Sequence, residues 1–165
     1  MRIFYLILKL EVYNVDEKEK LTIRDAENAG KGLLALVMAY PNYPKGFKAD
    51  NQTVKWNDIN PERSIGLFPM QGAVYLEKYV SGSYVAQMPF QLIFRSSPTT
   101  NRTSMDAQQM LNDLAAWMEE SGIEFKDPHM KLESINRTSP VFGGGKSEKN
   151  TDYAVNMTMK YFYQK

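Results

Sequence analysis

Apolar and polar side chains alternate most regularly at the C-terminal end of the chain. Between Asp152 and Tyr163, large apolar or aromatic residues occupy every second position, with small and polar residues between them. Successive side chains of a strand point to opposite faces, so this period of two predicts an amphipathic strand with one buried face. The face expected in the core comprises Tyr153, Val155, Met157, Met159, Tyr161 and Tyr163.

A β-hairpin is predicted in the middle of the chain. Strand-forming residues dominate 72–80 and 83–95, and Ser81 with Gly82 supplies a turn between them. Pro89 lacks an amide proton, so we expect it at a bulge or an edge. A shorter strand is expected at 129–138. The core face of the second hairpin arm comprises Tyr84, Ala86, Met88, Phe90, Leu92 and Phe94.

Two helices are expected, at 22–39 and from Ser104 to Gly122. Thr22 with Asp25 resembles a capping box at the start of the first, and Ser104 is the expected cap of the second. Gly30 and Gly32 each weaken a helix interior, which indicates either close packing or a frayed first half. The stripe expected on the second helix is Ala107, Met110, Leu111, Leu114, Trp117 and Met118.

The remaining segments are expected to be loops or an extension. Residues 2–15 read as a buried strand or a short helix, and the charged run 16–20 reads as a solvated connector. Residues 1–20 are therefore an N-terminal extension or strand, and 21–165 form one domain. Residues 40–64 and 143–150 are predicted to be loops. The expected fold is α/β (α+β), with two principal helices on a mixed, mostly antiparallel sheet.

Composition excludes several classes of partner. The 20 basic and 19 acidic side chains give a net charge of +1, so no excess charge would attract nucleic acid or an anionic membrane. No cysteine is present, which removes disulfides, thiolate metal sites and a cysteine nucleophile. The apolar run Ile3 to Leu10 is shorter than the roughly 20 residues that cross a bilayer. Lys9 and Glu11 interrupt this apolar run, so it does not fit the hydrophobic region of a signal peptide.

The sequence offers no catalytic, cofactor-binding or metal-binding constellation. Gly145, Lys146 and Ser147 resemble the end of a phosphate-binding loop, but Pro140 stands where that motif requires glycine. His129 is the single histidine and is expected in an exposed turn. The carboxylates of the second helix lie on its polar face, where solvated charges belong. We therefore predict a protein that is not an enzyme and uses no cofactor or small-molecule substrate.

Two loops are the predicted surfaces for protein partners. A loop as long as 40–64 is uncommon in a compact domain unless it has a function, and its aromatic residues could anchor a partner. The second loop is flexible and glycine-rich. The predicted contact residues are Tyr43, Phe47 and Trp56 in the first loop, and Gly143, Gly144, Gly145 and Lys146 in the second.

The C-terminal two-thirds of the chain resembles the tail-terminator and minor capsid family of long-tailed phages. The run Met88 to Arg95 (MPFQLIFR) is similar to the YPFQLYFR of that family, except that Met88 replaces an aromatic residue. The other matching residues, in order, are Val74, Tyr75, Glu77, Tyr79, Gly82, Tyr84, Asp106, Ala107, Gln108, Leu111, Trp117, Thr138, Ser139, Pro140, Asp152, Tyr153, Lys160 and Tyr161.

The resemblance implies a structural protein of the virion. A tail terminator caps the growing tail tube and joins it to the head connector as a hexameric ring, so the implied partners are copies of itself, the tube protein and the connector or stopper protein. The implied location is the head–tail junction, after assembly in the host cytoplasm. A head-completion or stopper subunit is the nearest alternative. A small-molecule enzyme or sensor, with a pocket between sheet and second helix, represents another class, and a host binding module a third.

Overall fold

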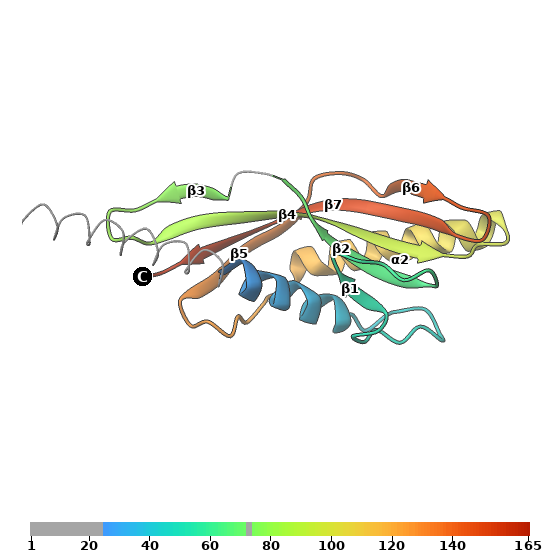
Figure 1. Cartoon of the computed structure of the whole chain (residues 1–165), viewed down its shortest axis with the longest axis horizontal. Coiled ribbons are helices and arrows are strands. Elements are labelled where there is room, and N and C mark those ends of the chain that lie inside the picture. Colours follow the sequence, from blue (N-terminus) through green and yellow to red (C-terminus); the bar gives the residue numbers. More distant parts are fainter. Residues whose placement is uncertain (1–24, 72–73) are drawn as a thin grey trace, which may run out of the picture.

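The computed structural model describes residues 25–71 and 74–165. The expected strand at 2–15, the connector at 16–20 and the capping residue Thr22 therefore lie outside the described residues. Within the described part, two helices pack on a seven-stranded mixed sheet, which confirms the expected α+β fold (Figure 1). One helix covers residues 25–38, and the other, α2, spans Asn101–Glu120.

Two long antiparallel strands form the centre of the sheet. β4 (Tyr84–Ser96) and β7 (Thr151–Tyr163) pair over their whole length, from Tyr84 opposite Tyr163 to Ser96 opposite Thr151. Both strands turn alternate side chains into one core, as their sequences predict. The side chains of this face with 6% exposure or less are Ala86, Phe90, Leu92, Phe94, Tyr153, Val155, Met157, Met159, Tyr161 and Tyr163.

Four shorter strands flank this central pair, two on each side. Beside β4 lie β2 (Ser64–Pro69) and β3 (Tyr75–Lys78), and beside β7 lie β5 (Met130–Arg137) and β6 (Phe142–Lys146). A fifth short strand, β1 (Val54–Trp56), runs parallel to β2 on its outer side. The β3–β4 hairpin and β5 confirm their predictions. Gly82 adopts a φ of 92° in the hairpin turn, a conformation that favours glycine.

Pro89 lies in a central strand without loss of a ladder bond. Its carbonyl accepts a bond from the Met70 amide at 2.8 Å, on the side of β4 that faces away from β7. The N–H and C=O of one residue in a strand point to the same side, so the missing amide proton also faces this side. There β2 ends at Pro69 and β3 begins at Tyr75, and the proline occupies the interval between them.

Both predicted loops contain a short strand, so the predictions are confirmed for the rest of 40–64 and for 147–150 and were wrong for the strand residues. Residues 40–64 include β1 and lead into β2, and the glycine run is the edge strand β6. β2 buries its first four residues, Ser64 to Leu67, and so lacks alternation. Gly66 is required within it, because an added Cβ would lie 2.7 Å from the carbonyl oxygen of Asp58. Three of the five residues of β6 are glycines, and the strand is held by its backbone pairing with β7.

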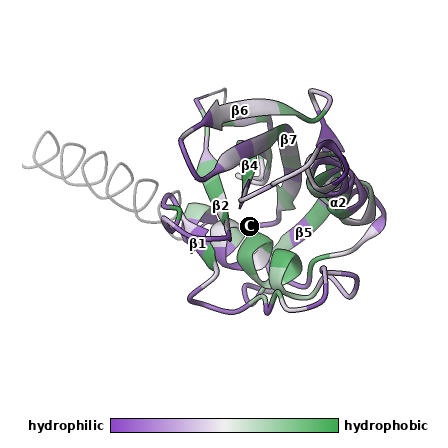
Figure 2. Cartoon of the chain, turned by 90° about the vertical axis from the view of Figure 1, so that its right-hand side faces the viewer, coloured by the Kyte–Doolittle hydropathy of each residue, from purple (hydrophilic) through white to green (hydrophobic). Residues whose placement is uncertain are grey.

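Both helices contribute to the single core on the inner face of the sheet. Ala29, Leu33 and Val37 from the 25–38 helix join Leu111 and Leu114 of α2 in one buried cluster with β4 and β7. Figure 1 shows the two helices on the same side of the central strands, and Figure 2 shows this arrangement along the long axis. The opposite face of β4 and β7 carries polar cross-strand pairs, such as Arg95 with Asp152 at 2.8 Å.

The glycines of the 25–38 helix mark close packing. A Cβ on Gly30 would lie 2.9 Å from the indole ring of Trp56, and one on Gly32 would lie 2.8 Å from Ile123. Real Cβ atoms do not approach other atoms so closely, so each glycine lets a neighbour rest against the helix backbone. Of the two explanations that the sequence left open, close packing is confirmed.

The cap of α2 is Thr100, so the expectation of Ser104 was wrong. The Thr100 hydroxyl accepts from the Thr103 amide at 3.2 Å, and the Thr103 hydroxyl accepts from the Thr100 amide at 3.0 Å. This reciprocal pair satisfies amides that the first helical turn leaves free. The Ser104 hydroxyl instead pairs with that of Tyr153 on β7. The helix ends at Glu120, two residues before Gly122.

Candidate partner interface

A group of large apolar side chains is exposed around β3. Five of the six exposed large apolar residues in the described part of the chain lie between residues 70 and 80, and Val80 is fully exposed. We call four of them, Val74, Leu76, Tyr79 and Val80, the β3 patch. The Tyr79 ring continues the patch onto β7, where it lies 6.2 Å from the ring of Phe162. Such a patch on an edge strand is typical of a surface that a partner covers.

Charged side chains of β3 are held beside this patch. The Tyr79 hydroxyl donates to the Glu77 carboxylate at 2.7 Å, and this bond raises the pKa of Tyr79. The Lys78 ammonium lies 4.4 Å from the centre of the Tyr75 ring. In the described residues, β3 forms a strand ladder with β4 alone, so its second edge faces outward. The sequence predicted the hairpin but not the patch, although the apolar run Val74 to Leu76 signalled a strand with two apolar faces.

β6 presents a second open edge, on the other side of the sheet. It pairs with β7 with a register shift between Gly143 and Gly145, and no other described strand pairs with it. All residues from Gly143 to Lys146 are exposed, and an added Cβ at Gly143 or Gly145 would meet nothing within 4 Å. The structure therefore brings the four predicted contact residues of this segment together on one bare strand edge. Their contact with a partner stays a prediction.

The aromatic residues predicted as anchors in 40–64 are half-buried against the core. Tyr43 donates to the carbonyl of Val37, and burial raises the pKa of its hydroxyl. Its ring lies 5.1 Å from that of Phe47, and Trp56 rests on Gly30. These three rings shape the surface by packing inward, and only part of each is accessible to a partner. Their role as anchors is not tested by the structure.

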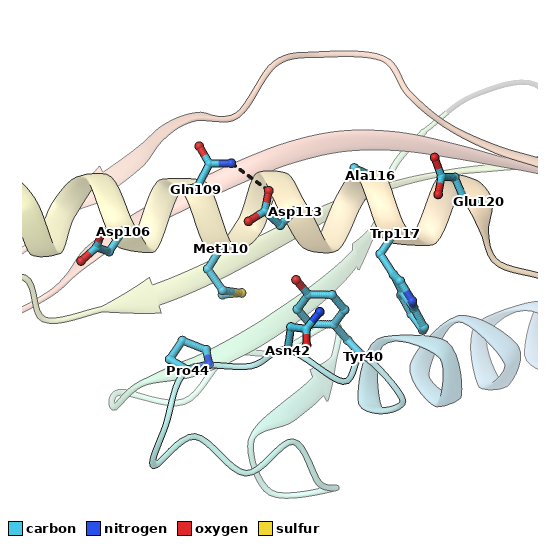
Figure 3. Close-up of a pocket in the computed structure, with 10 residues that line it drawn as sticks. All are labelled: Tyr40, Asn42, Pro44, Asp106, Gln109, Met110, Asp113, Ala116, Trp117 and Glu120. Carbon is cyan, nitrogen blue, oxygen red and sulfur yellow. Dashed lines mark hydrogen bonds between the residues drawn. The ribbon is translucent and has the colours of Figure 1, made fainter.

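An open groove runs along the outer side of α2 (Figure 3). Its volume is about 520 Å³, and the loop from Tyr40 to Pro44 forms its second wall. Asp106, Asp113 and Glu120 line it together with apolar side chains, and Asp113 accepts a bond from Gln109 at 2.8 Å. The carboxylates of α2 thus lie on its polar face, as predicted.

The space between the middle of α2 and the two central strands is filled by apolar side chains. Leu111, Leu114 and Met118 of the helix are fully buried against β4 and β7. The small-molecule alternative placed a pocket in this space, but the groove of Figure 3 lies on the other side of the helix. A second open pocket of about 670 Å³ lies between the end of α2 and β5, and its lining includes Glu120, Ile123 and Met130. A small ligand would therefore have to be sought in both places.

Asp25 is a buried carboxylate outside any chemical constellation. It is 2% exposed, and neither of its side-chain oxygens has a hydrogen-bond partner. Burial, with a smaller contribution from Asp127, raises its pKa to about 7. Burial, and after it the charge of Asp25, raises the pKa of Tyr161 and of Tyr163. No three His, Asp or Glu side chains of the described residues are grouped to hold a metal ion.

His129 lies in an exposed turn, as predicted. Its Nδ1 atom is 2.7 Å from the backbone carbonyl of Gln164, and its ring lies 5.7 Å from that of Tyr163. These contacts connect the turn before β5 to the C-terminal end of β7. In residues 25–71 and 74–165, no helix is long and apolar enough to cross a membrane.

Comparison with known proteins found solved structures that are similar to this chain. No family model matches the chain. No curated protein matches it in sequence. A chain from the virion of a native gene transfer agent particle is 8% identical with a TM-score of 0.47, over 67% of this chain and 78% of that one. A second solved chain, named only by a sequence identifier, is 15% identical with a TM-score of 0.47, over 88% of this chain and 96% of that one.

Proposed function

We propose that this protein is a structural subunit of a phage virion, a tail terminator that caps the tail tube and joins it to the head connector. The observation that carries the proposal is the β3 patch, a cluster of exposed apolar side chains beside an open strand edge. Water contact with such a cluster is unfavourable, and a protein neighbour that covers it gains the free energy of that burial. The resemblance in sequence includes Val74, Tyr75 and Tyr79 in and beside this patch.

The active form in this proposal is a ring of identical subunits, six by the family resemblance. A closed ring uses one heterologous interface repeatedly, so each subunit needs two different complementary surfaces. The sheet offers two different open edges on its two sides, at β3 and β6. The two flat ends of such a ring would then contact the tube protein and the connector.

The segment 40–64 and the hairpin of β6 with β7 supply the remaining contacts in this proposal. Tyr43, Phe47 and Trp56 shape the first surface, and Gly143 to Lys146 form the exposed strand of the second. Exposed backbone without side chains suits contact with a partner, because the partner can approach the backbone closely.

Negative-stain imaging of the purified protein tests the proposal. We expect rings of uniform diameter at tens of micromolar. Val80→Lys should abolish them, because it places a charge in the surface to be covered, and Met105→Lys, at an exposed site on α2, is the matched control. Monomers in every preparation of the unaltered protein would refute the proposal.

Loss of the gene separates the tail-terminator role from the stopper role. A tail terminator stops tube growth, so we expect its absence to give overlong tails that fail to join heads. Filled heads that leak their DNA beside tails of normal length would assign the protein to the head-completion class instead. A ligand-dependent rise in melting temperature, lost on changes in the groove of Figure 3, would favour the small-molecule class.

A further inference from the structure

We propose that the outer edge of β3 from Leu76 to Lys78 in one subunit pairs, antiparallel, with the outer edge of β6 in the next, so that the sheet continues between neighbours. The inference rests on the proposed function, because it assumes a ring. It adds which surfaces meet and in which direction their strands run.

Exposure is highest in β3 and β6 among the edge strands, and β5 follows with four of its eight residues exposed. Three of the four residues of β3 and four of the five residues of β6 are exposed. β1 has none exposed, and its Trp56 packs against the 25–38 helix. β5 lies against α2, and its last residue, Arg137, pairs with Glu119 of that helix. β3 and β6 are thus the edges that a neighbour can reach without disturbing the fold.

The topology places these two edges on opposite sides of the sheet. β3 bonds to β4 and β6 bonds to β7, while β4 and β7 bond to each other (Figure 1). Contact between β3 of one subunit and β6 of another therefore uses two different surfaces. It leaves β6 of the first subunit and β3 of the second available for further neighbours. Repetition of that contact adds subunits in one direction, and closure gives a ring.

Strand direction permits this pairing. β3 runs antiparallel to β4, β4 antiparallel to β7, and β7 antiparallel to β6. Within one subunit, β3 and β6 therefore run in opposite directions. β3 lies beside Tyr84 to Ala86 and β6 beside Thr151 to Ala154, at opposite ends of the central strands (Figure 1). A neighbour in about the same orientation, shifted along the strands by this separation, thus presents β6 antiparallel to β3, the arrangement whose hydrogen bonds run perpendicular to the strands.

The side chains of the two edges are complementary. β3 carries the bulky Leu76 and is followed directly by Tyr79, whereas Gly143 to Gly145 of β6 have no side chains and leave room above the strand. Glu77 of β3 is acidic and Lys146 of β6 is basic, so opposite charges come within reach across the joint.

Disulfide cross-linking tests the inference directly, because the natural chain contains no cysteine. Paired variants combine Leu76→Cys or Lys78→Cys with Gly143→Cys or Gly145→Cys. Both glycine positions have open space for a side chain. A disulfide requires Cβ atoms about 3.5–4.5 Å apart, so it reports direct strand contact. Oxidation of at least one pair should give a ladder of covalent multimers that a reductant returns to single chains.

Controls separate this joint from other contacts. Leu76→Cys alone and Gly145→Cys alone should give no covalent dimer, and a mixture of the two should give covalent dimers with one chain of each. Met105→Cys with Gly145→Cys, which combines β6 with an exposed site on α2, should also give none. A dimer from Leu76→Cys alone would show that β3 meets β3 and would overturn the inference.

The outcomes distinguish the inference from the proposed function. Rings in the micrographs with no ladder from any of the four pairs would overturn the β3–β6 joint and leave the ring intact. Single chains throughout, with no rings and no ladder, would overturn both. Near-ultraviolet circular dichroism of each variant confirms that it is folded before either result is read.

Discussion

Replacement of Asp25 by asparagine should stabilise the protein, and the gain should grow with pH. The Asp25 carboxylate is buried without a hydrogen-bond partner, and its pKa rises from 3.8 to about 7. Burial is the larger cause, and the charge of Asp127 adds to it. Ionisation at neutral pH therefore costs free energy that an uncharged amide of the same size does not incur.

The raised pKa of Asp25 gives the size and direction of the effect. The folded state binds the proton more tightly than the unfolded state, so Asp25 contributes full stability below pH 3.8 and loses it as pH rises toward 7. Each tenfold difference in proton affinity between the two states corresponds to about 1.4 kcal/mol. The difference in stability between Asp25→Asn and the natural protein should therefore be near zero at about pH 3 and reach at most about 4 kcal/mol above about pH 7. Water that enters on ionisation reduces this upper limit.

Urea unfolding of both proteins between pH 4 and 8 measures the difference. Subtraction of the two curves removes the contribution of every group that titrates alike in both proteins. Asp106→Asn, at an exposed position on α2, serves as the control and should show no comparable rise. A difference for Asp25→Asn that is independent of pH, or that is destabilising at pH 8, would refute the reasoning.

Three further predictions concern packing and capping. Gly30→Leu should destabilise the fold by about 1–3 kcal/mol, because the new side chain meets an indole ring, whereas Gly143→Ala should change little. Thr100→Ala should cost about 1 kcal/mol in urea unfolding through loss of the α2 cap, and a stability unchanged by it would contradict the cap. Phe90→Ala should cost about 3–5 kcal/mol, against almost nothing for the fully exposed Val80→Ala, both measured by thermal unfolding.

Elements with a clear period were predictable from the sequence. β4 and β7 are long, and each buries one face against the helices while the other face is polar. Apolar and polar residues therefore alternate along both strands. The stripe of α2 is equally clear, although its start was placed four residues too late. Several hydroxyl residues from Ser96 to Ser104 can cap a helix, and the choice of Thr100 depends on the reciprocal bond with Thr103.

The strands that the sequence did not reveal owe their existence to neighbours. β1 has three residues, and β2 is buried on both faces, so neither shows alternation. β6 contains three glycines, which disfavour an isolated strand, and it forms because β7 offers a partner. Tertiary pairing overrode local preference in each of these segments.

Of the two exposed segments in the candidate interface, the sequence predicted one. The sequence marked Gly143 to Lys146 as an exposed surface because glycine runs seldom lie in a core, and the structure places these residues on an open edge. The β3 patch required the structure, because apolar residues in a strand normally indicate burial. Only the pairing of β3 at the edge of the sheet shows that Leu76 and Val80 face outward.

Native mass measurement at tens of micromolar tests the central claim, self-association through the exposed edges, most directly. The unaltered protein should give one closed species at six times the subunit mass, and Val80→Lys should return it to the mass of one subunit without a loss of folding. A single-subunit mass for both proteins over the whole concentration range would contradict the account.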